Sequence, residues 1–418
     1  MTGPWHPALS KVFTELDRTE VVWALLRMPR DPQGGTGDLD MLIRQSDVPT
    51  MRKVTRDIGF VAVPGWSDPP NVVLLLYDRR SRCWLTLDIL TELSFGPEAA
   101  FQTAAETQVL QRRERRDGVW RLAPADEFWT TLLHCWIEKD AFREDHRASM
   151  LRLAPHADTG SVLARATEKV SSMTAAEIVG TVSRRDWSSI SNGSTTSWRH
   201  RTWRSRIRQM RRIYPVVFRR RGVSVALLGA NGSGKSSVAA SLVEHLPLRT
   251  IGVYMGLWGG TGLSHRLGPL AAVARPIEAW AKGGWAAAFQ LLGQSVVYDR
   301  YPYEALISWA AGRSAPKRWY MALLSRTCPR PDIIVVLDLA AARAHERKPE
   351  NSLRETEYEV ESYRWLAKQV NAHLIDGDRP LEQVTADVSD LVWQRYRRRW
   401  NPFLPVRRRK PPVSASRA

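Results

Sequence analysis

Eight consecutive residues, 229–236, have the types and the spacing of a phosphate-binding loop. Their sequence is Gly-Ala-Asn-Gly-Ser-Gly-Lys-Ser, which fits the pattern G-x-x-x-x-G-K-S, and the apolar run 223–228 precedes them. Glycines let backbone N–H groups converge on phosphates, a lysine brings positive charge to the β- and γ-phosphates, and a serine hydroxyl can bind Mg²⁺. The sequence therefore predicts ATP and Mg²⁺ as cofactors. The expected nucleotide-binding residues are Gly229, Asn231, Gly232, Ser233, Gly234, Lys235, Ser236 and Ser237, with Lys235 catalytic and Ser236 a metal ligand.

Three aspartates in the first half of the chain have a spacing that suits a second site. Asp38 and Asp40 alternate along an expected strand, so their side chains share a face, and Asp88 lies on a second expected strand. Three such carboxylates can hold Mg²⁺ ions that bind a triphosphate and activate a hydroxyl. Three interpretations stay open: an active site, a nucleotide-binding site without turnover, or a structural role as turn and strand-edge acids.

The composition is that of a two-domain globular protein. The chain has 418 residues, and its three cysteines show no spacing typical of a disulfide framework or a zinc site. We find no signal-peptide pattern and no apolar stretch of about 20 residues, so we expect a cytoplasmic protein.

The net charge of +18 belongs to two segments. Residues 184–221 contain twelve arginines against one acid, and residues 395–418 contain eight arginines and one lysine against none. The stretch 198–221 mixes arginine with apolar residues at helical spacing, so it and residues 395–410 could contact an anionic membrane surface or a polyanion. A solvated interdomain helix fits the same pattern. We expect no specific nucleic acid, because the arginine runs lack a docking motif.

A small polar stretch, 188–197, divides the chain into two parts. Before it we expect a helix at 20–26, strands at 39–43, 72–77 and 83–90, a helix at 48–58, and helices throughout 125–182. After it, apolar runs at 223–228, 250–255, 295–298, 333–337 and 373–376 alternate with helical stretches, which predicts an α/β fold with a parallel sheet flanked by helices. The expected domains are an α+β domain (1–124), a helical extension (125–187), a flexible linker with a basic amphipathic helix (188–221), a P-loop domain (222–396), and a basic Pro/Arg-rich tail (397–418).

Residues 222 to about 392 resemble a thymidylate-kinase-type P-loop kinase. The resemblance rests on four motifs in order: the loop 229–236, Asp-Arg-Tyr at 299–301, the strand and acid of 331–338, and Ile-Asp-Gly at 375–377. It implies that Asp299 lies near Mg²⁺ or the acceptor and that Arg300 binds an acceptor phosphate. An acid at the carboxyl end of a parallel strand suits this place beside the phosphate loop. Asp338 could compete for the metal role, but the resemblance places it at the start of a helix, as a cap.

Residues 343–350 resemble the lid of the same family. The resemblance implies that Arg347, and secondly Arg343, neutralise charge on the transferring phosphoryl group. Two departures limit what the resemblance implies, one in the phosphate loop and one in the acceptor region. Asn231 stands where family members often carry an acid, and the region around Trp258, Trp280 and Trp285 shows no pattern of thymine recognition, so the acceptor is not identified.

Residues 15 to about 180 resemble the minimal nucleotidyltransferase fold. The resemblance rests on Gly-Asp-Leu-Asp at 37–40 and on Leu-Asp-Ile at 87–89, and it implies a metal site at the three aspartates described above. The Gly-Ser pair that usually anchors the phosphates is replaced by Leu-Leu-Arg-Met-Pro at 25–29.

We therefore expect an ATP- and Mg²⁺-dependent P-loop phosphotransferase. Its acceptor would be a small molecule such as a nucleotide, a sugar or another metabolite, and the first half would add a second, nucleotidyltransferase-like site. The alternative is a P-loop switch or scaffold whose ATP state controls binding to a membrane, a polyanion or a protein partner.

Overall fold

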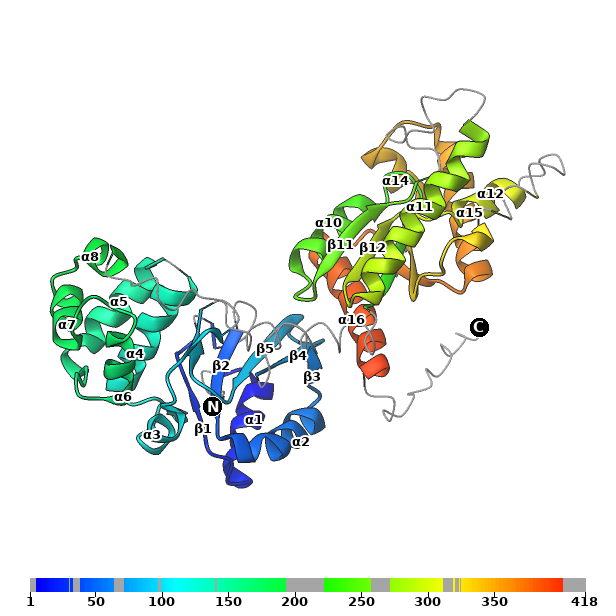
Figure 1. Ribbon diagram of the computed structural model, residues 1–418. Coiled ribbons are helices and arrows are strands. Elements are labelled where there is room, and N and C mark those ends of the chain that lie inside the picture. The colour runs from blue at the N-terminus through cyan, green and yellow to red at the C-terminus, as the bar shows by residue number, and fades with distance from the viewer. Residues whose placement is uncertain are drawn as a thin grey trace. The chain divides into compact units, whose positions relative to one another are not determined.

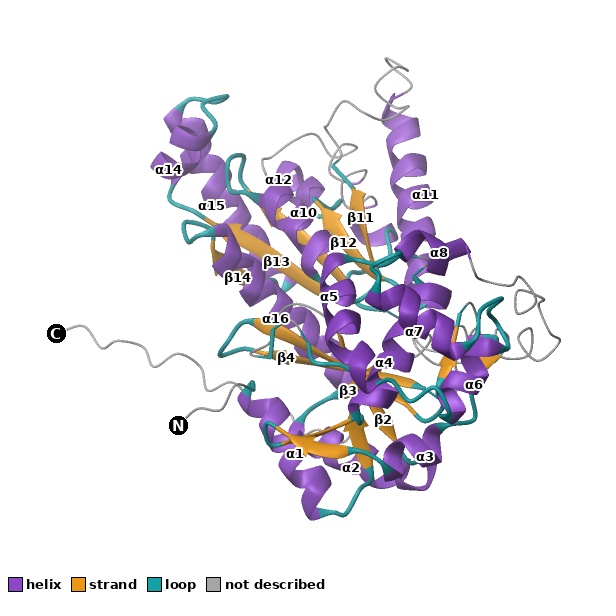
Figure 2. Ribbon diagram, turned by 90° about the vertical axis from the view of Figure 1, so that its left-hand side faces the viewer, coloured by secondary structure: helices purple, strands orange, loops and turns teal. Residues whose placement is uncertain are grey.

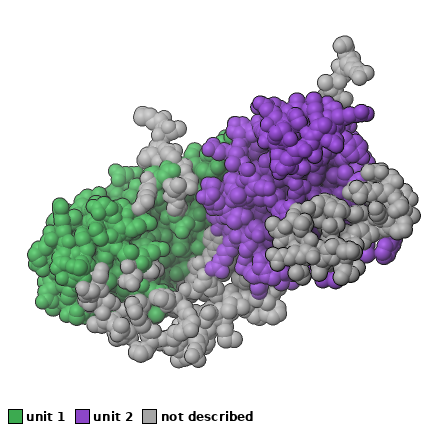
Figure 3. Space-filling view, turned by 90° about the horizontal axis from the view of Figure 1, so that it is seen from above, with its two compact units in different colours: residues 1–219 green, residues 220–418 purple. Residues whose placement is uncertain are grey.

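The chain forms two compact units, residues 1–219 and 220–418, which Figure 3 shows in different colours. The computed structural model describes residues 5–29, 31–32, 38–63, 71–96, 99–139, 141–192, 222–256, 271–310, 319, 323 and 325–400. The expected basic helix at 198–221, Trp258 and the tail from residue 401 lie outside the described residues.

Unit 1, residues 1–219, contains a seven-stranded mixed sheet (Figure 1). Its strands lie in the order β3-β4-β5-β2-β1-β9-β8. The expected strand pair is confirmed, because β4 and β5 are antiparallel neighbours, and β5 also pairs in parallel with β2. The strands are β1 (Trp23–Leu25), β2 (Asp38–Ile43), β3 (Val61–Val63), β4 (Val72–Asp78), β5 (Cys83–Leu90), β8 (Glu114–Arg116) and β9 (Val119–Arg121), with β6 (Ser94–Phe95) and β7 (Phe101–Gln102) in a separate two-stranded sheet.

Helices complete unit 1 and share a hydrophobic core with the sheet. Leu42 of the sheet and Phe128 and Ile190 of the helical part belong to the same buried cluster. The helices are α1 (Pro7–Arg18), α2 (Val48–Ile58), α3 (Glu106–Gln111), α4 (Pro124–Leu133), α5 (Glu144–Leu153), α6 (Val162–Glu168), α7 (Ala175–Ser183) and α8 (Trp187–Asn192), with a π-helical turn at His134–Glu138 after α4.

Two local expectations for unit 1 are wrong. Residues 20–26 contain strand β1 in place of a helix, because a short apolar run fits a buried strand as well as a helix and its neighbours β2 and β9 pair with it. The expected linker start at residue 188 is also wrong, because Trp187–Asn192 form helix α8. Ile190 is fully buried, and the Asp186 carboxylate accepts hydrogen bonds from Ser188 and Ser189, so this serine-rich stretch forms α8.

Unit 2, residues 220–418, has the expected parallel sheet with helices on both faces. Its strand order is β11-β12-β10-β13-β14, and every neighbouring pair is parallel, which confirms the α/β prediction (Figure 2). One face packs on α11 and α15, while α10 and α16 lie on the other. The strands are β10 (Ser224–Gly229), β11 (Thr250–Tyr254), β12 (Ser295–Asp299), β13 (Ile333–Asp338) and β14 (His373–Asp376). The helices are α10 (Lys235–His245), α11 (Ala271–Leu291), α12 (Glu304–Ala310), α14 (Ala341–Arg347), α15 (Leu353–Val370) and α16 (Leu381–Trp400).

The end of α16 corrects the expected start of the tail at residue 397, because the helix continues to Trp400. Arg395 and Arg399 both contact the carboxylate of Asp332, at 3.3 and 2.6 Å, and Arg399 also donates to the Gly222 carbonyl. These two arginines of the basic stretch 395–410 therefore tie the last helix to the sheet. Contact between the basic segments and a membrane or polyanion stays a prediction.

Among the helices of the described ranges, none is long and apolar enough to cross a membrane.

Candidate phosphate-binding site

The loop after β10 turns sharply into α10, and three glycines make this turn possible. Gly229, Gly232 and Gly234 have φ values of 148°, 80° and 86°, which side chains rarely adopt. A Cβ on Gly229 would lie 2.8 Å from the Leu337 carbonyl oxygen, and one on Gly232 would collide with the Ala344 carbonyl. Strand β13 and helix α14 therefore leave no room for side chains at these two positions.

Lys235 is the first residue of α10, and its side chain reaches back to the loop. Its Nζ donates hydrogen bonds to the carbonyls of Gly229 and Ala230, both at 2.7 Å, and the residue is only 5% exposed. Burial, and secondly the charge of Arg300, lower its pKa to about 8, although nearby carboxylates act in the opposite direction. The next two expected residues, Ser236 and Ser237, are exposed in the first turn of α10. The loop thus gathers a buried ammonium group, two hydroxyls and a helix N-terminus, as phosphate binding requires.

Asp299 ends the strand next to β10. It is the register partner of Leu227, two residues before Gly229, so its carboxyl group lies at the same edge of the sheet as the loop. Its Oδ1 is buried and has no hydrogen-bond partner in the structure. A buried, unpaired carboxylate oxygen is costly unless something binds it, and with the Ser236 hydroxyl it forms a donor set that fits Mg²⁺. Binding of Mg²⁺ by Asp299 and Ser236 stays a prediction.

Arg300 connects the strand end to the loop. It adopts an unusual φ of 66°, and its guanidinium donates to Asn231 Oδ1 at 2.8 Å and to Glu304 Oε1 at 3.2 Å. Glu304 is 6% exposed and accepts a further hydrogen bond of 2.8 Å from the Tyr363 hydroxyl. Burial raises the pKa of Glu304, while Arg300 and the Tyr363 hydrogen bond oppose this shift. Asn231 is uncharged, whereas the kinase family often has an acid at this position. Its side-chain oxygen accepts the hydrogen bond that holds Arg300.

The two arginines that the resemblance assigns to a lid contact the loop after β14. Arg343 and Arg347 approach Asp378 Oδ1 at 3.4 and 3.2 Å, and Arg347 also donates to the Gly377 carbonyl at 3.1 Å. A Cβ on Gly377 would lie 3.3 Å from the Ser233 carbonyl oxygen, so this loop adjoins the phosphate loop. The arginines therefore lie beside the site, and their action on a transferring phosphoryl group stays a prediction.

The expected capping role of Asp338 is wrong. Helix α14 begins three residues later, after Ala340, and no side chain caps it. The Asp338 carboxylate instead accepts a 2.8 Å hydrogen bond from Arg364 of α15. Strand β13 therefore ends in a surface ion pair, which leaves Asp299 as the stronger metal candidate.

Of the acceptor-region tryptophans, the two that the structure describes do not form part of the core. Trp280 and Trp285 of α11 are 40% and 52% exposed, and the Trp280 indole donates to the Thr327 hydroxyl at 2.6 Å. Their exposure leaves the acceptor unidentified.

No protein-family model and no curated protein matches the chain. A solved structure of thymidylate kinase from Candida albicans is similar to it, with a TM-score of 0.36 and 16% sequence identity. The likeness covers 42% of this chain and 93% of the kinase. At this level of similarity, function has to be inferred from the site itself.

The aspartates of unit 1 come together on neighbouring strands. Asp40 and Asp88 are register partners on β2 and β5, and Asp38 lies opposite Thr86. Burial and the charge of Asp40 raise the pKa of Asp38, while Lys139 and a Thr86 hydrogen bond oppose this. Asp40 forms an ion pair with Arg27. Within the described ranges, no three such side chains are placed to hold a metal ion, so the metal role of the aspartates stays a prediction.

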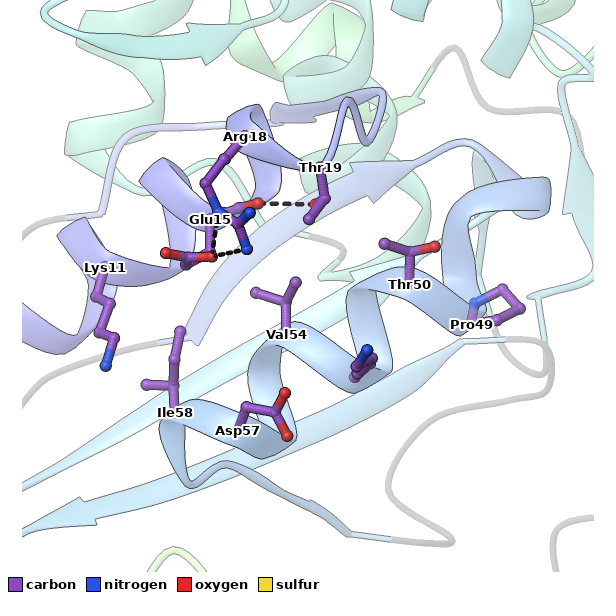
Figure 4. Close-up of a pocket in the computed structure, with 10 residues that line it drawn as sticks. Lys11, Glu15, Arg18, Thr19, Pro49, Thr50, Val54, Asp57 and Ile58 are labelled. Atoms are coloured by element: carbon purple, nitrogen blue, oxygen red, sulfur yellow. Dashed lines mark hydrogen bonds and ion pairs between the residues drawn. The ribbon is translucent and has the colours of Figure 1, made fainter.

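A surface groove of about 620 Å³ lies between α1 and α2 of unit 1, and Figure 4 shows its mixed lining of charged and apolar side chains. Glu15 and Arg18 form an ion pair of 2.8 Å on its wall, and Lys11 and Asp57 also face it. None of the residues expected from the sequence to act in catalysis or binding lines this groove.

Sequence reasoning missed three residues of the candidate phosphate-binding site: Glu304, Glu359 and Tyr363. Glu359 Oε1 accepts a 3.0 Å hydrogen bond from the backbone N–H of Asn231. The available signal was weak. Glu359 and Tyr363 are four residues apart, hence on one face of a helix, and the same face carries the buried Val360 and Leu366. Two polar side chains on the apolar face of a helix indicate a buried hydrogen-bond network.

Proposed function

We propose that unit 2 is an ATP-dependent phosphotransferase that moves the γ-phosphoryl group of ATP to a small acceptor. One observation supports this most strongly. A nearly fully buried lysine lies inside a loop of three positive-φ glycines, and an unpaired buried carboxylate oxygen lies at the end of the adjacent strand. Burying a lysine and a carboxylate oxygen in this way is costly in a structural turn, and the arrangement suits phosphate and metal binding.

The residues would divide the work by charge and position. Backbone N–H groups of the loop and the N-terminus of α10 would bind the phosphate oxygens, and Lys235 would bring its charge to the β- and γ-phosphates. Ser236 and Asp299 would hold Mg²⁺, which when bound neutralises phosphate charge. Arg300, fixed by Asn231 and Glu304, would act on the acceptor side. Catalysis would then rest on positioning and on electrostatic stabilisation.

Turnover of radiolabelled ATP tests this proposal. We expect Lys235→Ala to reduce ATP turnover by about 10²-fold or more, because the variant lacks the ammonium charge that would stabilise the transferring phosphoryl group. Lys368→Ala is the matched control, since Lys368 is an exposed lysine of α15. Equal turnover by wild type and Lys235→Ala would refute the proposal.

Nucleotidyl transfer by unit 1 is a separate proposal, favoured by the register that places Asp40 beside Asp88. If it holds, the double variant Asp38→Ala/Asp40→Ala abolishes incorporation of α-labelled nucleotide into product while γ-phosphoryl transfer continues. Loss of both activities, or of neither, would count against it.

A further inference from the structure

A carboxylate from α15 is anchored to the phosphate loop. Glu359 Oε1 accepts the Asn231 backbone N–H at 3.0 Å, which fixes one end of the carboxylate. The other oxygen, Oε2, is buried and makes no hydrogen bond in the structure. A carboxylate oxygen buried in this way is destabilising unless a ligand group supplies a donor.

A closed set of hydrogen bonds holds Glu359 in this place. Tyr363, one helical turn further along α15, donates to Glu304 at 2.8 Å, and Arg300 donates to both Glu304 and Asn231. Asn231 in turn donates its backbone N–H to Glu359, so these hydrogen bonds join α12, α15 and the loop. Such preorganisation is typical of groups that act on a reacting atom.

The charges around Lys235 indicate which acceptor this site suits. Asp299, Glu304 and Glu359 all act electrostatically on Lys235, and so does Arg300. Among the cations of the described residues near the loop, Lys235, Arg343 and Arg347 are the ones expected to act on the phosphates of ATP. Arg300 is already bonded to Glu304 and Asn231. A phosphate monoester would bring about two further negative charges next to these carboxylates and ATP, whereas a hydroxyl group brings none and can donate a hydrogen bond.

We propose that Glu359 is a catalytic residue whose Oε2 accepts the hydrogen bond, and then the proton, of an acceptor hydroxyl. The acceptor is therefore a hydroxyl compound and not a phosphate monoester. The inference rests on the phosphotransferase activity proposed above. In the step, the hydroxyl oxygen forms a bond to the γ-phosphorus, and the bond to the β,γ-bridging oxygen breaks. ADP leaves with that electron pair, and the hydroxyl proton passes to Glu359.

Water can take the place of the acceptor, so single-turnover ATP hydrolysis tests the proposal without a known acceptor. Glu359→Gln keeps an oxygen for the Asn231 N–H but cannot take a proton. We expect it to bind ATP as wild type does and to hydrolyse it about 10²-fold more slowly. Glu359→Asp keeps the carboxylate but withdraws it by one methylene, and we expect an intermediate rate. Glu357→Gln, an exposed glutamate on the same helix, is the matched control and should behave as wild type.

The outcomes separate the two proposals. Hydrolysis at the wild-type rate by both Glu359→Gln and Glu359→Asp, with ATP binding intact, would overturn the role of Glu359 alone. Failure of the wild type to bind ATP, or binding that Lys235→Ala leaves unchanged, would overturn the phosphotransferase itself.

Matched acceptor pairs test the substrate class. The probes are thymidine with thymidylate and glycerol with glycerol 3-phosphate, each with γ-labelled ATP. Label transferred to a hydroxyl group of thymidine or glycerol supports the proposal. Label transferred to the phosphate of either monoester, giving a diphosphate, overturns it.

Discussion

If unit 2 binds ATP as proposed, the buried ammonium group of Lys235 should make ATP affinity depend on pH in a range where an ordinary lysine would have no effect. Its pKa of about 8 results mainly from burial. In the ligand-free protein its positive charge is therefore lost as the pH rises through about 8. An exposed lysine, with a pKa of about 10.4, stays charged up to pH 9.

The magnitude follows from the charged fraction. At pH 7 about nine-tenths of the Lys235 side chains carry a proton, and at pH 9 about one-tenth do. Because the charged form binds phosphate, the apparent dissociation constant of ATP should rise about tenfold between these two pH values. At pH 9, binding should also take up about one proton per ATP.

Isothermal titration calorimetry at pH 7, 8 and 9, in buffers of different ionisation enthalpy, measures both quantities. Lys235→Arg is the control, because a guanidinium group stays charged across this range and its profile should be flat. An ATP affinity that is constant from pH 7 to 9 in the wild type, without proton uptake, would refute the reasoning.

Three substitutions test the surroundings of the site by urea unfolding. Gly232→Ala should lower the free energy of unfolding by about 2 kcal/mol, for two reasons: the added Cβ would collide with the Ala344 carbonyl, and alanine is strained at the positive φ of this position. Gly234→Ala, with a similar φ but open space around the Cβ, should lower it by only about 1 kcal/mol, and equal losses would contradict the steric argument. Asp332→Asn should cost about 3 kcal/mol at pH 7, because the carboxylate is 8% exposed and holds two arginines of α16. Burial alone would raise the pKa of Asp332, but a backbone hydrogen bond from Ser224 and the charge of Arg399 outweigh burial and lower this pKa. The difference from wild type should therefore shrink below about pH 4, and a difference independent of pH would argue against the ion pairs.

The sequence was sufficient for those features that depend on local pattern. Each of the five apolar runs of unit 2 became a strand of the parallel sheet. In β10, β12 and β13 nearly every residue is buried, and strands buried on both faces are almost continuously apolar. The loop itself was predictable because glycine, lysine and serine each have one physical role there. The three-residue strand β1 was not, because its conformation depends on pairing with β2 and β9.

Contacts between distant residues account for what could not be predicted in the site. Asn231 and Glu359 are 128 residues apart, and Tyr363 and Glu304 are 59 apart, so no local spacing links them. The resemblance to the kinase family implied that Asp338 caps a helix, yet its carboxylate instead accepts a hydrogen bond from Arg364 of α15. Such partners are set by the packing of α12 and α15 on the sheet, which a single sequence does not encode in a readable pattern.

The central claim is that the loop after β10 binds ATP through Lys235, and calorimetric titration of ATP with Mg²⁺ tests it most directly. We expect the wild type and the control Lys368→Ala to bind ATP with the same affinity, and Lys235→Ala to lose the binding event that belongs to unit 2. Undiminished binding by Lys235→Ala would contradict the account.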